Sequence, residues 1–247
     1  MAVPNWLTAR PVAHRGLHDL ADGVLENTPT AARAAAEAGF PIECDVQLTA
    51  DGEAVVFHDF TLDRLTAAAG RLDERTAAEL ATVPFKATTD RIPTLDAYLD
   101  LIGGRVPLII EIKSRFDGDL RLTRRVAEIV NRRPEPVALM SFDPAIVEAL
   151  IDLAPGKVRG VVAEAHYVEG EWTKLDGDAK RSLGHLLHVG RSRPDFLAWH
   201  VKDLPHAVPN MARHFGMPVL TWTVRTPDDR ARAAEFADQM IFEGFRP

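Results

Sequence analysis

Short apolar runs recur along the chain, and most are apolar at successive positions rather than at alternate ones. Strands that are covered by helices on both faces have this pattern, which is typical of parallel sheets. We therefore predict eight buried strands. They lie at residues 11–14, 42–48, 108–113, 138–142, 159–162, 196–201, 218–224 and 240–243.

The polar stretches between these runs predict helices. Segments 28–39, 94–102, 120–131 and 144–154 have helical periodicity or high alanine content, and Pro29 and Pro144 suit the first turn of a helix. Eight strands alternating with helices favour an α/β fold of the (β/α)8 TIM-barrel type. An open doubly wound sheet is disfavoured because no glycine-rich nucleotide fingerprint follows the first strand.

One stretch breaks the alternation. A strand-like run at 54–58 follows the turn signal Asp51–Gly52, and an irregular segment comes after it. We predict one barrel domain over residues 1–247, with a small insertion at about 49–91 after the second strand. Segment 164–193 predicts a helix or two.

Composition narrows the class of protein. The chain has 247 residues with a formal charge of −7, which excludes the basic footprint of a nucleic-acid-binding protein. It shows neither a signal peptide nor an apolar stretch that could span a membrane. A single cysteine, Cys44, cannot build a disulfide framework. We expect a cytoplasmic protein without stable membrane insertion, and the sequence does not indicate its oligomeric state.

Carboxylates lie on two of the predicted strands, near the end at which a barrel carries its active site. Glu43 and Asp45 are two residues apart and share one face of a strand, which leaves Cys44 on the other face, and Glu111 lies on the next strand of the barrel. Three carboxylates in one barrel mouth repel one another unless a positive charge lies between them. The all-oxygen set predicts one divalent metal ion, Mg²⁺ or Ca²⁺.

Cations and histidines come from the same strand ends. Arg15 and Lys113 predict an anionic substrate, most simply a phosphate that contacts both the metal and these cations. Lys113 has a second interpretation, because a lysine beside a carboxylate can simply neutralise it. His14 and His58 are the candidates for proton transfer.

Ordered motifs over nearly the whole chain resemble the glycerophosphodiester phosphodiesterase family. They are "AHRG", "ENT", "IECDVQLTADGEAVVFHD", "LDRLT…G", "IPTL", "EIK", "SF" and "WTV". The resemblance implies hydrolysis of a small-molecule glycerophosphodiester to glycerol 3-phosphate and an alcohol. It also implies a metal on the three carboxylates, acid–base catalysis by the two histidines, phosphate contacts from Arg15 and Lys113, and Trp222 in the wall of the substrate pocket rather than only in the barrel interior.

The chain departs from the family pattern at two places. Arg225 stands where the family usually has asparagine, and the last strand leads into "FEGFRP" with Glu243 near the expected acid. Two alternatives stay open, a phospholipase D-like or C-like activity on lysolipids and a non-catalytic phosphodiester-binding barrel. Seven further histidines show no metal-ligand spacing and are expected at the surface or in the core: His18, His166, His185, His188, His200, His206 and His214.

Overall fold

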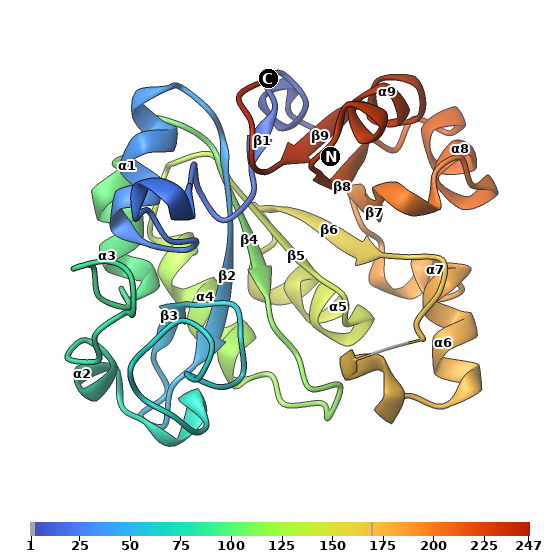
Figure 1. Cartoon of the computed structure of the whole chain (residues 1–247). Helices are drawn as coiled ribbons and strands as arrows, with labels where there is room; N and C mark the ends of the chain where they lie inside the picture. The colour runs from blue at the N-terminus through green and yellow to red at the C-terminus, as the bar shows by residue number, and fades with distance from the viewer. Residues whose placement is uncertain (1–2, 169) are drawn as a thin grey trace.

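The computed structural model, which describes residues 3–168 and 170–247, contains a closed barrel of eight parallel strands (Figure 1). The sheet runs β1-β9-β8-β7-β6-β5-β4-β2, and pairing of β1 with β2 closes it. The predicted (β/α)8 fold is confirmed. The barrel strands are β1 Val12–Ala13, β2 Ile42–Leu48, β4 Leu108–Ile112, β5 Val137–Ser141, β6 Val158–Ala163, β7 Phe196–His200, β8 Val219–Val224 and β9 Gln239–Phe242.

Helices surround the barrel between successive strands. Those around the barrel are α1 Pro29–Glu37, α3 Leu95–Ile102, α4 Arg121–Asn131, α5 Pro144–Leu153, α6 Gly177–Gly184, α7 Val189–Ser192, α8 Ala207–His214 and α9 Pro227–Phe236. Pro29 and Pro144 stand in the first turns of α1 and α5, as predicted. Over the described residues, no helix combines the length and apolarity needed to cross a membrane.

The stretch between β2 and α3 holds the elements that break the alternation. β3, Ala54–Val56, pairs antiparallel with β2, and the helix α2, Ala77–Leu80, follows. The strand predicted at 54–58 ends earlier, at Val56, and one further backbone hydrogen bond joins the chain to β2, from the Phe57 N–H to the Asp45 carbonyl oxygen at 3.0 Å. Phe57 then packs in an apolar cluster of this stretch together with Leu62 and Leu72. His58 thereby lies at the end of a separately packed unit beside the barrel mouth.

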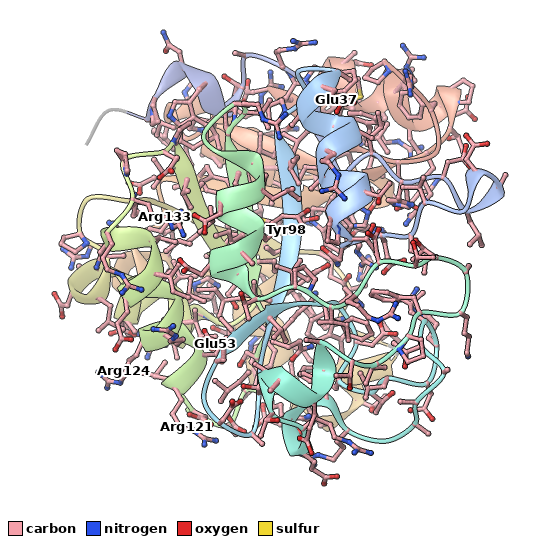
Figure 2. All side chains as sticks on the ribbon, turned by 90° about the vertical axis from the view of Figure 1, so that its left-hand side faces the viewer. Glu37, Glu53, Tyr98, Arg121, Arg124 and Arg133 are labelled. Carbon is pink, nitrogen blue, oxygen red and sulfur yellow. The ribbon has the colours of Figure 1, made fainter. Side chains whose placement is uncertain are left out.

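Strand parity separates the two faces of the barrel wall. Cys44 is buried in the apolar layer between the strands and the outer helices, as predicted. Figure 2 views this side of the barrel from outside, with α1 and α3 on either side of β2, and Tyr98 of α3 is buried. Glu43 and Asp45 occupy the alternate positions of β2 and are buried as well. The same parity that places apolar groups under the helices places carboxylates inside the barrel.

Side chains fill the barrel interior toward the amino ends of the strands, and Gly160 makes room for one of them. A Cβ atom at Gly160 would lie 2.3 Å from the Phe196 ring, which is fully buried. The ring fills space that the missing side chain leaves free, so that this end of the barrel is a packed core rather than a channel.

We expect Gly160→Ala to lower the free energy of unfolding by about 1–3 kcal/mol because the added methyl group overpacks the Phe196 ring. Gly156→Ala is the matched control, since no heavy atom lies within 4 Å of its Cβ position. Urea denaturation of the two variants measures the difference. Equal stabilities would contradict this account of the interior.

Candidate active site

A cavity of about 280 Å³ opens at the carboxyl ends of the barrel strands. Its walls hold charged groups on one side and aromatic rings on the other. The residues that line it are His14, Arg15, Glu43, His58, Glu111, Lys113, Met140, Phe142, Val162, Glu164, Trp172, His200, Trp222, Thr223, Arg225 and Ile241.

Three carboxylates converge at this mouth. In the parallel pairing of β2 and β4, Asp45 lies opposite Glu111, and Glu43 is two residues earlier on the same face of β2. One carboxylate oxygen from each residue lies within 4.8 Å of the others, and all three side chains are buried. The sequence-predicted metal set therefore forms one compact cluster.

Two cations offset part of the negative charge of the cluster. The Lys113 ammonium lies 2.8 Å from Asp45 Oδ1 and 2.5 Å from Glu111 Oε1, and the Arg15 guanidinium lies 3.2 Å from Asp45 Oδ2 and 2.6 Å from Glu26 Oε1. The sequence predicts that both cations contact a phosphate, with neutralisation of a neighbouring carboxylate as the second interpretation of Lys113. The structure places them in the cavity wall, where they are paired with carboxylates.

A tight turn after β1 adds backbone and amide donors. Arg15 and Gly16 have φ of 57° and 85°, and a Cβ atom on Gly16 would lie 2.9 Å from Ala31, so glycine is required. The turn directs the Arg15 backbone N–H to Glu43 Oε2 at 3.1 Å. Asn27 Nδ2 donates to Asp45 Oδ2 at 2.9 Å. Each metal-candidate carboxylate of β2 is thus held by a hydrogen bond from the β1–α1 loop.

The electrostatics of the cluster fit a cation. Burial, together with the charges of Asp45 and Glu111, raises the pKa of Glu43 well above its usual range. Burial alone would raise the pKa of Asp45 too, but Lys113 and Arg15 hold it well below its usual range. Within the described residues, Glu43 Oε1 is buried without a hydrogen-bond partner. A buried carboxylate oxygen that lacks a donor, in an all-oxygen set, is suited to a hard divalent ion.

Both candidate histidines line the cavity, and a carboxylate holds each through Nδ1. His14 Nδ1 lies 2.7 Å from Glu243 Oε2, and His58 Nδ1 lies 2.7 Å from Asp59 Oδ1. His14 Nε2 faces the cluster, 3.9 Å from Glu43 Oε2. Burial lowers the pKa of His14 to about 4 although the bond to Glu243 opposes this shift. His14 is therefore neutral at pH 7 in this arrangement.

Aromatic rings form the opposite wall. Trp222 packs edge-on against Phe142 at 5.4 Å between ring centroids, and Phe142 contacts Trp172 at 4.8 Å. Trp222 contacts the apolar barrel interior and lines the cavity, so both interpretations of this residue hold geometrically. His200, expected at the surface or in the core, lies in the wall 4.9 Å from Trp222. That expectation was wrong because β7 ends at the mouth.

His18 also departs from its expected place. A ring nitrogen of His18 lies within 4.8 Å of ligand atoms of His14 and Glu243, although the sequence shows no metal-ligand spacing among the three. The cluster forms because β1 and β9 are neighbours in the closed sheet, which brings together residues from opposite ends of the chain.

The sequence did not indicate the groups that connect His58 with Arg15, the neighbour of His14. Arg64 Nε lies 2.6 Å from Asp59 Oδ2, and Arg64 Nη2 lies 2.7 Å from Glu26 Oε1, the oxygen that also contacts Arg15. The motif "ENT" marked Glu26 without assigning a role, and no spacing pattern connects it with Arg64. A continuous chain of charges therefore runs from His58 to Arg15.

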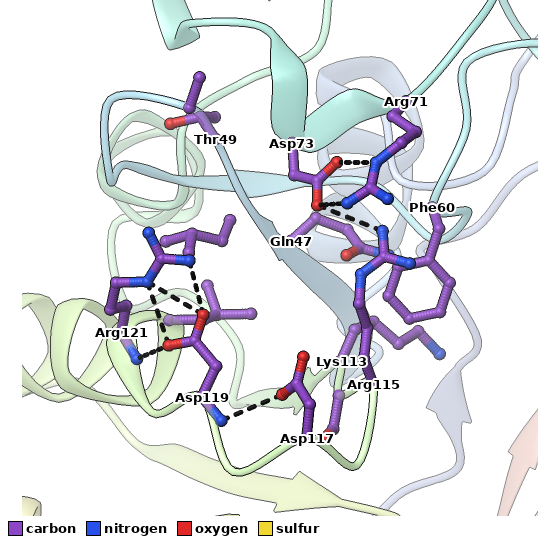
Figure 3. Close-up of a pocket in the computed structure, with 14 residues that line it drawn as sticks. Gln47, Thr49, Phe60, Arg71, Asp73, Lys113, Arg115, Asp117, Asp119 and Arg121 are labelled. Carbon is purple, nitrogen blue, oxygen red and sulfur yellow. Dashed lines mark hydrogen bonds and ion pairs between the residues drawn. The ribbon is translucent and has the colours of Figure 1, made fainter.

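A second hollow, of about 230 Å³, lies between the β2–α3 stretch and the loop before α4 (Figure 3). Its arginines are already paired, Arg71 and Arg115 with Asp73 and Arg121 with Asp119. Among the described residues, this hollow has no buried carboxylate cluster, whereas the cavity with the two histidines contains part of one and is therefore the candidate active site.

Comparisons with known proteins agree on one family. A family model described as "Glycerophosphoryl diester phosphodiesterase family" matches residues 14–243. A glycerophosphodiester phosphodiesterase of Caldanaerobacter subterraneus subsp. tengcongensis is 32% identical over 233 residues, which cover 90% of this chain and 88% of the relative. A glycerophosphodiester phosphodiesterase of Bacillus subtilis is 32% identical over 256 residues, which cover 95% and 83%.

Solved structures show the same fold. An Oleispira antarctica phosphodiesterase in complex with the product sn-glycerol-3-phosphate superposes with a TM-score of 0.77 at 21% identity and covers 95% of this chain and 92% of that chain. A Thermotoga maritima glycerophosphodiester phosphodiesterase superposes with a TM-score of 0.71 at 25% identity, with 94% of each chain covered. The protein described here belongs to the glycerophosphoryl diester phosphodiesterase family.

Proposed function

We propose that this protein hydrolyses water-soluble glycerophosphodiesters to glycerol 3-phosphate and an alcohol, with a divalent ion and two histidines. The observation that carries the proposal is a cavity lined by two carboxylate-held imidazoles and by two members of a cluster of three buried carboxylates. The product bound in the Oleispira antarctica phosphodiesterase and the names of the curated relatives support this substrate class.

Glu43, Asp45 and Glu111 would hold the divalent ion. When bound there, the ion stabilises negative charge on the phosphoryl oxygens in the transition state. Arg15 and Lys113 bring two further positive charges to the same wall. They would orient the diester and reduce the charge repulsion that it meets from the carboxylates.

The two histidines would move the protons. Because a carboxylate accepts from each Nδ1–H, the free nitrogen of each ring is Nε2. One histidine takes the proton of the nucleophile as its oxygen attacks phosphorus. The other, which must carry a second proton on Nε2 before the reaction, gives that proton to the alkoxide as the P–O bond to the alcohol breaks. The nucleophile is water or the neighbouring glycerol hydroxyl, and in the second case water opens the cyclic phosphate.

Phe142, Trp172 and Trp222 would form the side of the pocket that excludes water from the reacting phosphate. Rings at this position give the organic part of the substrate an apolar surface. A substrate panel that includes glycerophosphocholine, glycerophosphoethanolamine and a lysolipid distinguishes this proposal from the phospholipase-like alternative, since hydrolysis of the lysolipid alone would favour that alternative.

Chelation and Glu43→Gln test the metal set. We expect chelation to abolish release of glycerol 3-phosphate from glycerophosphocholine, and Mg²⁺ or Ca²⁺ to restore it. In metal-free protein, Glu43→Gln should raise the melting temperature by about 2 °C or more, because it removes a buried carboxylate whose pKa is raised by burial and by like charges.

The same variant should lose the further stabilisation that the divalent ion gives to the wild-type protein. Glu37→Gln, at an exposed position of α1, is the matched control and should leave both properties unchanged. Activity that survives complete chelation, or ion-dependent stabilisation that survives Glu43→Gln, would contradict the proposed metal set.

Replacement of either histidine tests proton transfer. We expect His14→Ala and His58→Ala each to lower kcat by about 10²-fold or more, because each removes an acid or a base. Binding of the divalent ion, measured by calorimetry, should persist. His214→Ala, exposed on α8, serves as the control. Turnover close to that of the wild type in either cavity variant would rule out the role assigned to that histidine.

A further inference from the structure

Each of the two histidines is hydrogen-bonded to a carboxylate through Nδ1, and each of these carboxylates accepts a hydrogen bond from an arginine. Asp59 accepts from His58 and is held by two hydrogen bonds from Arg64. On the other side, Glu243 Oε2 lies 2.7 Å from His14 Nδ1 and accepts from Arg225 Nη2 at 2.9 Å. The repetition at both histidines indicates that the arrangement serves the imidazoles rather than the surface.

Backbone hydrogen bonds fix the second set in space. The His14 N–H donates to the Phe242 carbonyl oxygen at 2.9 Å, and the Glu243 N–H donates to the Val224 carbonyl oxygen at 3.0 Å. The ends of β1, β8 and β9 therefore hold His14, Glu243 and the residue next to Arg225 in one register. The two side chains also have little room to move, since only 10% of the His14 side chain and 23% of the Glu243 side chain are exposed.

The contact determines which nitrogen of His14 can react. A carboxylate that accepts at Nδ1 stabilises the tautomer with the proton on Nδ1, and this leaves the lone pair on Nε2. Nε2 is the atom that faces Glu43 and the carboxylate cluster, 3.9 Å away. Without Glu243 the ring would be free to rotate or to take the other tautomer.

We propose that Glu243 and Arg225 are positioning residues for His14: Glu243 fixes the ring and its tautomer, and Arg225 fixes the carboxylate. The inference rests on the proposed function only for its effect on catalysis. Arg225 makes one hydrogen bond to Glu243, and 54% of its side chain is exposed, whereas Arg64 makes two to Asp59 and further bonds to Glu26. Because Arg225 acts on His14 only through Glu243, its loss should lower kcat less than the loss of Glu243 does.

We do not assign a metal site to His14, Glu243 and the neighbouring His18. Ligand atoms of His14, His18 and Glu243 lie within 4.8 Å of one another, which is close enough for a cation. This set offers one carboxylate and two imidazoles, and that carboxylate already accepts from Arg225, whereas Glu43, Asp45 and Glu111 offer three carboxylates, the oxygen ligands that Mg²⁺ and Ca²⁺ prefer.

Nitrogen-15 NMR of histidine-labelled protein tests the positioning directly. We expect wild-type His14 to show the Nδ1–H tautomer, Glu243→Ala to show a mixture of tautomers, and Glu243→Gln, which keeps an accepting oxygen, to restore much of the Nδ1–H signal. An unchanged His14 tautomer in Glu243→Ala would overturn the proposal. So would a site for Zn²⁺ that shifts His14 and His18 together and is lost in Glu243→Ala.

Kinetics test the effect on catalysis. Glu243→Ala should lower kcat by about tenfold or more with little change in KM, and Arg225→Ala should lower it by about two- to fivefold, the scale of a half-exposed ion pair. Arg225→Lys should restore part of this loss. In a His14→Ala background, Glu243→Ala should cause no further loss, because it acts through the ring that has been removed.

Three results would contradict these expectations. An equal loss from Glu243→Ala with and without His14 would show that Glu243 does not act through this ring. A rise in KM without a fall in kcat in Arg225→Ala, restricted to substrates with anionic head groups, would make Arg225 a substrate-binding residue instead. If the wild-type protein hydrolyses no diester, the proposed function fails, while the NMR result still decides the positioning.

Discussion

Three buried carboxylates at the mouth of the barrel are the constraint on which the site depends. Charged groups are stable away from water only when they are paired, and removal of one partner from such a pair typically costs about 3–5 kcal/mol. Lys113 and Arg15 supply the pairing for Asp45, and Lys113 also for Glu111, whereas Glu43 keeps one buried oxygen without a donor within the described residues. The cluster is thus almost neutralised, and the remaining charge is placed where a divalent ion would fit.

The barrel produces this cluster through strand parity and register. In β2, alternate residues point to the helices or to the interior, so Cys44 enters the apolar outer layer while Glu43 and Asp45 enter the mouth. Parallel pairing then sets Asp45 opposite Glu111 on β4. Closure of the sheet brings β9 beside β1, which delivers Glu243 to His14 over a separation of 229 residues. Strand register and sheet closure thus bring His14 and the three carboxylates together, whereas His58 comes from the loop after β3.

Much of this arrangement could be predicted from the sequence, because it follows from local patterns. Uninterrupted apolar runs identified the eight strands, and the spacing of Glu43 and Asp45 identified their common face. Contacts between loops could not be predicted, since no periodicity relates Glu26 to Arg64 or places Trp172 in the cavity wall. Ion pairing could be predicted only in part: the sequence allowed Lys113 to neutralise the neighbouring Glu111, but its second ion pair, with Asp45, depends on the strand register.

The central claim is that the three carboxylates form a metal site used for diester hydrolysis. A crystal structure with Mn²⁺ and glycerol 3-phosphate tests it most directly, because anomalous scattering locates the Mn²⁺ ion. We expect an anomalous peak within about 2.0–2.6 Å of oxygens from Glu43, Asp45 and Glu111, with the phosphate on the same ion. An ion bound by His14, His18 and Glu243, with none at the three carboxylates, would contradict it.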